Sequence, residues 1–292
     1  MNTTRIDSAL VLGAVAYDAK VVTIWDGFQR WFAERGFAFD YVLYSNYERQ
    51  VAAHFDGAFD VAWNSPLAWL QAERVATARG CKARAIAMRD TDQDLTSVIV
   101  TKSGGAIREL QDLRGKTLGV GAGDSPQATM IPLQHLAEQG LVAERDFAVR
   151  RFDVLVGKHG DHVGGERDAA KALMAGEVDA ACMIDGNHLV FLNEGTLSRD
   201  GTRVLTQTGA YDHCNFTVLN GLPHSAGAAA KIARFADLLL SMRYDDPAVR
   251  PLLDLEGLKQ WRPGRTSGYR LLADACDRFG WLAPFLEQMG AA

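Results

Sequence analysis

The sequence predicts an α/β protein made of two lobes, and three features support this fold class. Apolar runs of strand length alternate with segments of helical periodicity, which is typical of mostly parallel sheets covered by helices. The alternation occurs as two series, of which the second begins near residue 103. The chain has 292 residues, 48% of them hydrophobic, so it is long enough for two domains or one large one.

The first series runs from the first apolar segment to residue 102. Its apolar runs predict strands at 9–17, 39–46, 59–65, 83–88 and 96–102. Helical periodicity predicts helices at 21–36 and 47–55 and a third that ends at Gly80, and the first of these places Ile24, Trp25, Phe28, Trp31 and Phe32 on one face. Ser65 followed by Pro66 is a typical start for the third helix, with Ser65 as its N-cap.

The second series predicts strands at 117–122, 147–153, 178–184 and 213–220, with helices at 126–140 and 165–177. After residue 220 the chain is mainly helical, at 225–243 and 267–279. No linker rich in Pro, Gly or Ser separates the two series, so we expect two crossing strands to join the lobes. Lobe 1 is expected to comprise residues 1–98 plus 218–292, and lobe 2 residues 99–217.

Composition argues against several classes of protein. The net charge is -5 and no run of Lys and Arg forms a basic stripe, so we expect no nucleic-acid partner. No segment approaches the roughly 20 apolar residues that span a bilayer, so no membrane insertion is expected. The four cysteines form no C-x-x-C pair, which favours buried free thiols over a structural metal site. The apolar run at 9–16 is typical of a strand rather than a signal peptide, so the expected location is cytoplasmic as given, or periplasmic for a trimmed chain.

Aromatic and small polar residues follow several of the predicted strands. Ligands bind beyond the carboxyl ends of the strands in open parallel sheets, so these positions predict a small-molecule site, although polar residues are also common in turns and helix caps. The candidate ligand-binding residues are Tyr17, Tyr44, Trp63, Asn64, Ser65, Ser125, Gln127 and Asp185. No cofactor is expected.

The glycine-rich stretch GVGAGDSPQ, which begins at Gly119, connects a predicted strand to a predicted helix. Its third glycine comes one place too early for a dinucleotide fingerprint, and it lacks the Gly-Lys-Ser/Thr of a phosphate loop. A helix that starts at Pro126 still has free N–H groups and a positive dipole end, which favour an anion. Ser125 could donate to such a ligand or could merely cap the helix, whereas Asp124 argues against a highly charged anion.

Histidines and a cysteine form a second candidate group: His159 and His162 in a Gly-rich loop, and His213 and Cys214 before the returning strand. These residues are candidate catalytic groups for proton transfer. They are also compatible with metal binding, with ligand contact or with no functional role.

Two segments of the chain resemble the phosphonate/phosphite branch of type II periplasmic solute-binding proteins. The stretch DLRGKTLGVGAGDSPQATMIPLQHLAEQG (112–140) is similar to the second-lobe signature of that family, and GERDAAKALMAGEVDAA (165–181) is similar to a later motif. FDVAWNSPLAW (59–69) is similar to a first-lobe turn. The resemblance implies two α/β lobes, built on two mixed sheets flanked by helices, that close on a small solute in the cleft between them. It also implies an ABC permease as a partner if the protein is exported.

Residue by residue, the resemblance also implies a change of ligand. The first anion-binding Ser of the family falls on Ser125, but the next two hydroxyl positions fall on Pro126 and Gln127, and the family His falls on Arg167. This reduced set of hydroxyls argues against a phosphonate or phosphate, so we expect an anionic or aromatic solute. The alternative is a cytoplasmic lyase or decarboxylase for a small carboxylic acid on the same fold, with the histidines as its acid–base groups.

Overall fold

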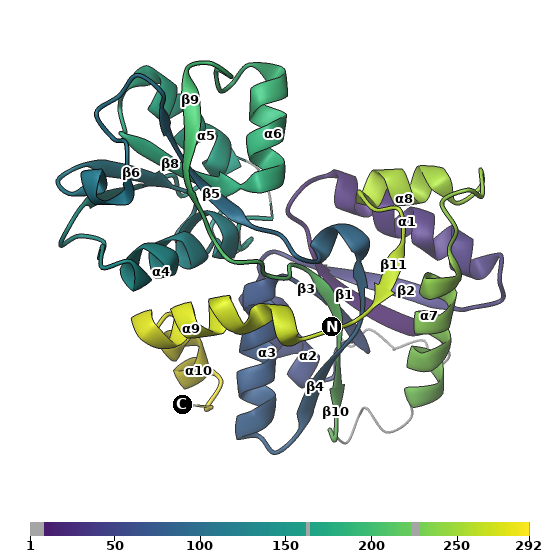
Figure 1. The fold of residues 1–292 in the computed structure, drawn as a ribbon. Coiled ribbons are helices and arrows are strands. Elements are labelled where there is room, and N and C mark those ends of the chain that lie inside the picture. The colour runs from purple at the N-terminus through teal and green to yellow at the C-terminus, as the bar shows by residue number, and fades with distance from the viewer. Residues whose placement is uncertain (1–8, 162–163, 223–227, 292) are drawn as a thin grey trace. The chain divides into compact units, whose positions relative to one another are not determined.

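The computed structural model describes residues 9–161, 164–222 and 228–291. The chain divides into two compact units, shown with their elements in Figure 1. Unit 1 comprises Met1–Gln93, His213–Thr266 and Ala283–Ala292, and unit 2 comprises Asp94–Asp212 and Ser267–Leu282. The predicted α/β class with two mixed sheets flanked by helices is confirmed.

Unit 1 is built on a mixed sheet of six strands: β1 (Leu10–Val15), β2 (Phe39–Tyr44), β3 (Val61–Asn64), β4 (Lys82–Arg89), β10 (Asn215–Asn220) and β11 (Trp261–Pro263). Their order in the sheet is β11-β4-β10-β3-β1-β2. Strands β1, β2 and β3 run parallel, and β10 lies antiparallel between β3 and β4. Because the three parallel strands end at one edge, the residues that follow them are brought together there.

The helices of unit 1 are α1 (Lys20–Ala33), α2 (Tyr47–Phe55), α3 (Pro66–Ala78), η1 (Asp90–Asp92), α7 (Ala229–Ser241), α8 (Arg250–Glu256) and α10 (Ala283–Gln288). The five apolar residues expected on one face of α1 are all buried, at most 6% exposed. Ser65 caps α3 as expected, because its hydroxyl accepts from Ala68 N at 3.1 Å. Both predictions depended only on nearby residues, and both are confirmed.

Gly13 lies inside β1, where a larger residue would collide with the core. A Cβ atom at this position would lie within 2.6 Å of three carbons of the Phe59 ring. We therefore expect Gly13→Ala to lower the free energy of unfolding by about 1–3 kcal/mol, because the ring has to move out of a packed core. Urea denaturation measures this difference.

Gly186 provides the matched control for that substitution. Outside its chain neighbours and its own helix backbone, no atom lies within 4 Å of the position that a Cβ atom would take there, and its backbone does not need a positive φ. Gly186→Ala is expected to leave stability unchanged or to raise it by up to about 1 kcal/mol, since alanine favours a helix. Equal effects of the two substitutions would contradict the packing argument at Gly13.

Unit 2 is built on a five-stranded mixed sheet: β5 (Ser97–Lys102), β6 (Thr117–Val120), β7 (Ala148–Arg151), β8 (Ala180–Ile184) and β9 (Thr202–Gln207). The order is β7-β6-β8-β5-β9, with β6 parallel to β7 and β8, and β5 antiparallel to β8 and β9. Its helices are η2 (Leu110–Leu113), the π-helical turn η3 (Pro126–Met130), α4 (Ile131–Glu138), α5 (Gly164–Ala175), α6 (Asp185–Glu194), η5 (Ser267–Tyr269) and α9 (Arg270–Phe279).

Several elements differ from the sequence expectation. Strand β9 was not expected, because it is an edge strand and its sequence, TRVLTQ, has few apolar residues. Helix α6 was not expected either, because its apolar residues do not gather on one buried face, and Leu189 is 60% exposed. Helix η3 and α4 together replace the single predicted helix at 126–140.

The boundaries of the two units also differ from the expected lobes. The chain passes between them at Gln93–Asp94 and Asp212–His213, a few residues before the expected points, and again at Thr266–Ser267 and Leu282–Ala283. Residues 267–282 group with unit 2, although the sequence expectation placed everything after 217 in lobe 1. Helix α9 belongs there because it packs against α4 and buries Leu272, Ala275 and Cys276.

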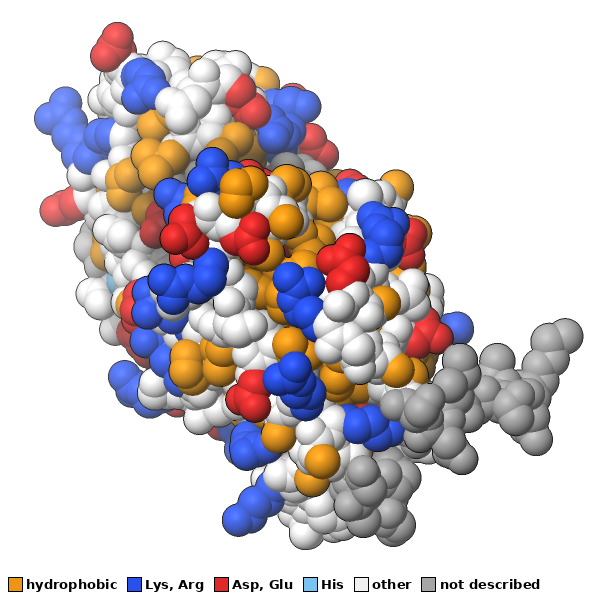
Figure 2. Space-filling model, turned by 90° about the vertical axis from the view of Figure 1, so that its right-hand side faces the viewer, with side chains coloured by type: hydrophobic (Ala, Val, Ile, Leu, Met, Phe, Trp, Pro, Cys, Tyr) orange, Lys and Arg blue, Asp and Glu red, His pale blue; other side chains and the backbone are white. Residues whose placement is uncertain are grey.

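Two further features concern the charge of the surface and the length and polarity of the helices. Figure 2 shows a face on which Lys and Arg side chains are interspersed with Asp and Glu, in keeping with the small net charge of -5. In the part of the chain that the structure describes, every helix is too short or too polar to cross a bilayer.

Candidate ligand-binding site

Two tyrosines lie at the edge of unit 1 where β1 and β2 end. Val15 is paired with Tyr44 in the parallel register, and Ala16 N donates to Tyr44 O at 3.0 Å, so Tyr17 comes just after this pairing. The Tyr17 side chain packs against the core cluster that contains Trp25, whereas Tyr44 packs against the cluster that contains Val51. Both tyrosines are partly exposed. The Tyr44 ring packs on Phe59 with centroids 5.6 Å apart, and burial raises the pKa of its hydroxyl. The phenol is therefore a neutral hydrogen-bonding group at neutral pH, which suits a wall of a binding site.

The other three candidates of unit 1 are engaged inside the protein. Trp63 is 4% exposed and contacts the aromatic core. The Asn64 side chain donates to Thr217 Oγ1 at 2.9 Å and accepts from Gln50 Nε2 at 2.8 Å. Ser65 is fully buried as the cap of α3. These residues hold the end of β3 in place rather than present open hydrogen-bonding groups.

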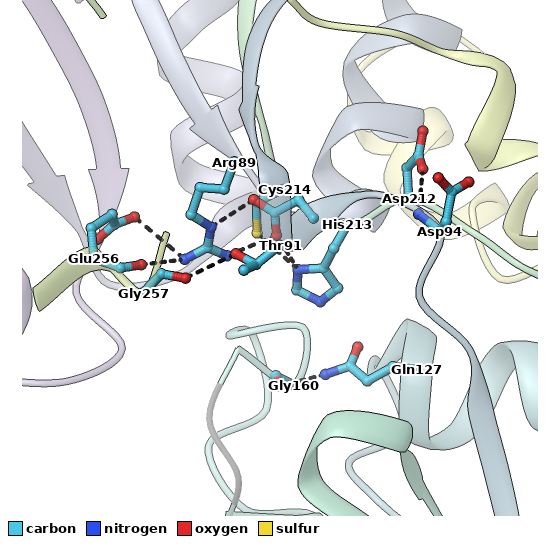
Figure 3. Close-up of polar contacts among 11 residues, drawn as sticks. Arg89, Thr91, Asp94, Gln127, Gly160, Asp212, His213, Cys214, Glu256 and Gly257 are labelled. Carbon is cyan, nitrogen blue, oxygen red and sulfur yellow. Dashed lines mark hydrogen bonds and ion pairs between the residues drawn. The ribbon is translucent and has the colours of Figure 1, made fainter. Parts of the chain in front are cut away.

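An ion pair that the sequence interpretation did not select joins the last residue of β4 to η1. Arg89 Nε donates to Asp92 Oδ2 at 2.6 Å and Arg89 Nη2 donates to Asp92 Oδ1 at 2.8 Å, while Nη1 donates to the backbone oxygen of Glu256 at 3.1 Å. Figure 3 shows Arg89 directed toward Glu256 and Gly257. Its guanidinium carbon also lies 5.2 Å from the Trp63 ring centroid. The guanidinium is thus already neutralised by the protein.

His213 and Cys214 adjoin this ion pair. His213 Nδ1 lies 3.1 Å from Cys214 Sγ and 3.6 Å from Asp92 Oδ1, and Figure 3 shows the ring beside Cys214. The Cys and Asp therefore meet the same ring nitrogen, whereas a nucleophile–base–orienter arrangement needs them on opposite nitrogens. The geometry does not support Cys214 as a nucleophile activated by His213.

The same three side chains could offer ligands to a metal ion. One atom from each of Asp92, His213 and Cys214 lies within 4.8 Å of the others, and all three are buried. Asp92, however, already receives two hydrogen bonds from the Arg89 cation. A divalent cation would have to displace or face that guanidinium, so the donor set fits a metal poorly.

The turn after β6 carries the candidates of unit 2. Ser125 is 1% exposed, and its Oγ accepts from Ala128 N at 3.2 Å. Gln127 is 3% exposed, and its Nε2 donates to Gly160 O at 2.6 Å, as Figure 3 shows. His159 is fully buried in the adjoining loop with a φ of 51°, and His162 lies outside the described residues. His159 belongs to unit 2, whereas His213 and Cys214 belong to unit 1.

Asp185 begins α6 at the end of β8. Its Oδ2 accepts from Thr96 Oγ1 at 2.7 Å and its Oδ1 accepts from Gly186 N at 2.7 Å. The side chain is only partly buried. Asp185 therefore combines fixed geometry with some exposure, as a ligand-orienting carboxylate requires.

Comparison with known proteins identifies relatives of the whole chain. The family model of the periplasmic substrate-binding protein of phosphonate ABC transporters matches residues 14–269. No curated protein sequence matches. Among solved structures, PhnD1 from Prochlorococcus marinus in complex with methylphosphonate is similar at a TM-score of 0.67 and 16% identity, with 94% of this chain and 98% of that chain covered.

Two other solved structures are described as binding proteins. One is the binding protein component of an ABC phosphonate transporter from Pseudomonas aeruginosa (TM-score 0.61, 11% identity, 97% and 96% of the two chains covered). The other is the periplasmic aliphatic sulphonate binding protein SsuA from Escherichia coli (TM-score 0.57, 17% identity, 95% and 87% covered). At these identities the structures show the shared fold alone. The lyase alternative receives no support from them.

Proposed function

Because the chain belongs to the family of periplasmic substrate-binding proteins of phosphonate ABC transporters, we propose that it binds a small anionic or aromatic solute and presents it to an ABC permease. The observation that carries this proposal is the extent of the family match, residues 14–269, which includes most of both units. Proteins of this family are periplasmic, and that is the location we propose for this chain.

The proposed ligand contacts lie at the carboxyl ends of the parallel strands in each unit. In unit 1, Tyr17 and Tyr44 supply apolar walls with a hydroxyl at one end. His213, 8% exposed, adds a polar ring beside the Arg89–Asp92 ion pair. In unit 2, Asp185 supplies a carboxylate that is already oriented by Thr96. Asn64 and Ser65 hold the end of β3 within unit 1, next to the contacts proposed there.

A ligand screen tests the proposed function. Thermal-shift measurements with carboxylates, aromatic acids, sulfonates and phosphonates are expected to yield at least one compound that stabilises the protein, because a ligand that binds only the native state raises its melting temperature. For that compound, Tyr44→Ala is expected to raise the Kd by about tenfold or more, which corresponds to about 1.4 kcal/mol. Isothermal titration calorimetry measures the change.

Tyr244 provides a matched control. Its hydroxyl donates to Asp254 Oδ1 at 2.6 Å, and it lies after α7 rather than at the end of a parallel strand. Tyr244→Ala is expected to leave the Kd unchanged. A screen with no stabilising compound would refute the binding function, whereas equal affinities of the Tyr44 and Tyr244 variants would remove only Tyr44 from the site.

A further inference from the structure

A loop of unit 2 lies over the turn that precedes η3. The Asp124 carboxylate accepts from two backbone N–H groups of this loop, Gly157 N at 2.5 Å and His159 N at 3.3 Å. The Gln127 side chain donates to a third backbone group of the loop, Gly160 O, at 2.6 Å. Residues on both sides of Ser125 therefore hold residues 157–160 against the turn.

The contact between this loop and Ser125 is close. A Cβ atom at Gly160 would overlap Ser125 Oγ and would lie 2.8 Å from Gln127 Nε2. Gly160 also has a φ of +72°, which favours glycine. The backbone of Gly160 thus occupies the space in front of the Ser125 hydroxyl.

Four backbone N–H groups of the turn already have acceptors within unit 2. Gly121 N donates to Ala128 O, and Ser125 N donates to Ala122 O. Gly123 N donates to Asp153 Oδ1, and Ala128 N donates to Ser125 Oγ. A phosphonate or sulfonate group bound at a helix N-terminus depends on such N–H groups. An anion that used these four N–H groups would have to break their present bonds.

A buried acceptor without a partner also lies at the turn. Gln127 Oε1 has no hydrogen-bond partner among the described residues, although the side chain is 3% exposed. The orientation of this amide follows from its neighbour, because Gly160 O can only accept and must face the nitrogen. With the Asp124 carboxylate nearby, the turn presents negative and partly negative oxygens, which repel an oxyanion.

We propose that residues 157–160 are the specificity determinant of unit 2, and that they exclude tetrahedral oxyanions from the turn at Ser125. This inference rests on the proposed function and narrows its substrate class: the solute does not place a phosphonate, phosphate or sulfonate group on Ser125. An anionic solute of this protein is then a carboxylate, or is held through other residues.

Binding measurements test the exclusion directly. Methylphosphonate, inorganic phosphate and methanesulfonate are titrated calorimetrically into the wild-type protein and into Ser125→Ala. We expect either no binding to both proteins or Kd values that agree within about twofold, since Ser125 makes no contact with the anion. An increase in Kd of tenfold or more in Ser125→Ala, for any of the three anions, would overturn the proposal.

Hydrogen exchange tests the attachment of the loop without any ligand. In Asp124→Ala the N–H groups of Gly157 and His159 lose their acceptor, so their exchange is expected to accelerate by about tenfold or more. Asp124→Asn is the control, because its side-chain oxygen still accepts and their exchange should stay near the wild-type rate. Unchanged exchange in Asp124→Ala would show that the loop is not held in this way. This readout remains decisive even if the ligand screen fails.

Discussion

Replacing Asp92 with asparagine is expected to lower the free energy of unfolding of unit 1 by about 3–5 kcal/mol, because the change removes the nearer of the two carboxylates that neutralise the Arg89 guanidinium. The Asp92 side chain is 2% exposed and that of Arg89 is 19% exposed. Glu256 remains as the weaker partner, because it makes one side-chain contact of 3.5 Å with Arg89, whereas Asp92 accepts two hydrogen bonds of 2.6 and 2.8 Å. Burial by itself would lower the pKa of Arg89, but the charge of Asp92 outweighs it and the pKa is raised well above its usual value.

The pH dependence of stability shows whether the ion pair between Arg89 and Asp92 stabilises the native state. Burial would raise the pKa of Asp92, but the Arg89 charge and the hydrogen bonds from His213 and Arg89 lower it to about 2. The unfolded-state pKa of Asp is about 3.9, so the stabilisation is fully present above about pH 4 and is lost as the pH falls toward 2. The difference between wild type and Asp92→Asn should therefore shrink over that range.

Denaturation followed by tryptophan fluorescence measures this effect, since only Trp281 among the six tryptophans lies in unit 2. Asp245→Asn is the control within unit 1, because it removes the exposed ion pair between Arg243 and Asp245, whose side chains are 77% and 84% exposed. That substitution should cost less than about 1 kcal/mol. If both variants lost similar amounts of unfolding free energy, the buried ion pair would stabilise the protein no more than the exposed one does.

Phe216→Ala is expected to destabilise unit 1 by about 3–5 kcal/mol, because it removes the centre of an aromatic cluster. Phe216 is fully buried in β10, and its ring centroid lies 4.6 Å from that of Trp63, 5.1 Å from that of Phe235 and 5.2 Å from that of Trp261. These neighbours come from a strand, a helix and another strand. They cannot all close the cavity without moving the sheet.

Two further variants provide reference values for the loss of stability expected in Phe216→Ala. Phe216→Leu keeps most of the volume and should cost clearly less than Phe216→Ala. Leu189→Ala removes a side chain that is 60% exposed and should change stability by no more than about 0.5 kcal/mol. Fluorescence-monitored denaturation compares the two Phe216 variants, and circular dichroism follows Leu189→Ala. A loss below about 1 kcal/mol for Phe216→Ala would contradict the central position of this ring.

Much of the fold could be predicted from the sequence because its signals are local. The buried face of α1 repeats with the period of a helix, and the Ser65-Pro66 start depends on residues three positions apart. Strands β1 and β8 are apolar throughout because both of their faces are covered. Edge strand β9 was missed since half of its surface is exposed and its residues are mixed.

The sequence by itself determined the α/β class, the resemblance to solute-binding proteins and the turn at Ser125 as a place to look. Only the tertiary structure decided which polar groups remain for a ligand. The Asn64 side chain donates to Thr217, which is 153 residues away in the sequence. The Gln127 side chain donates to Gly160, which is 33 residues away. The physical reason is that helix periodicity and capping depend on neighbours within a few residues, whereas hydrogen-bond partners are chosen by packing between distant segments.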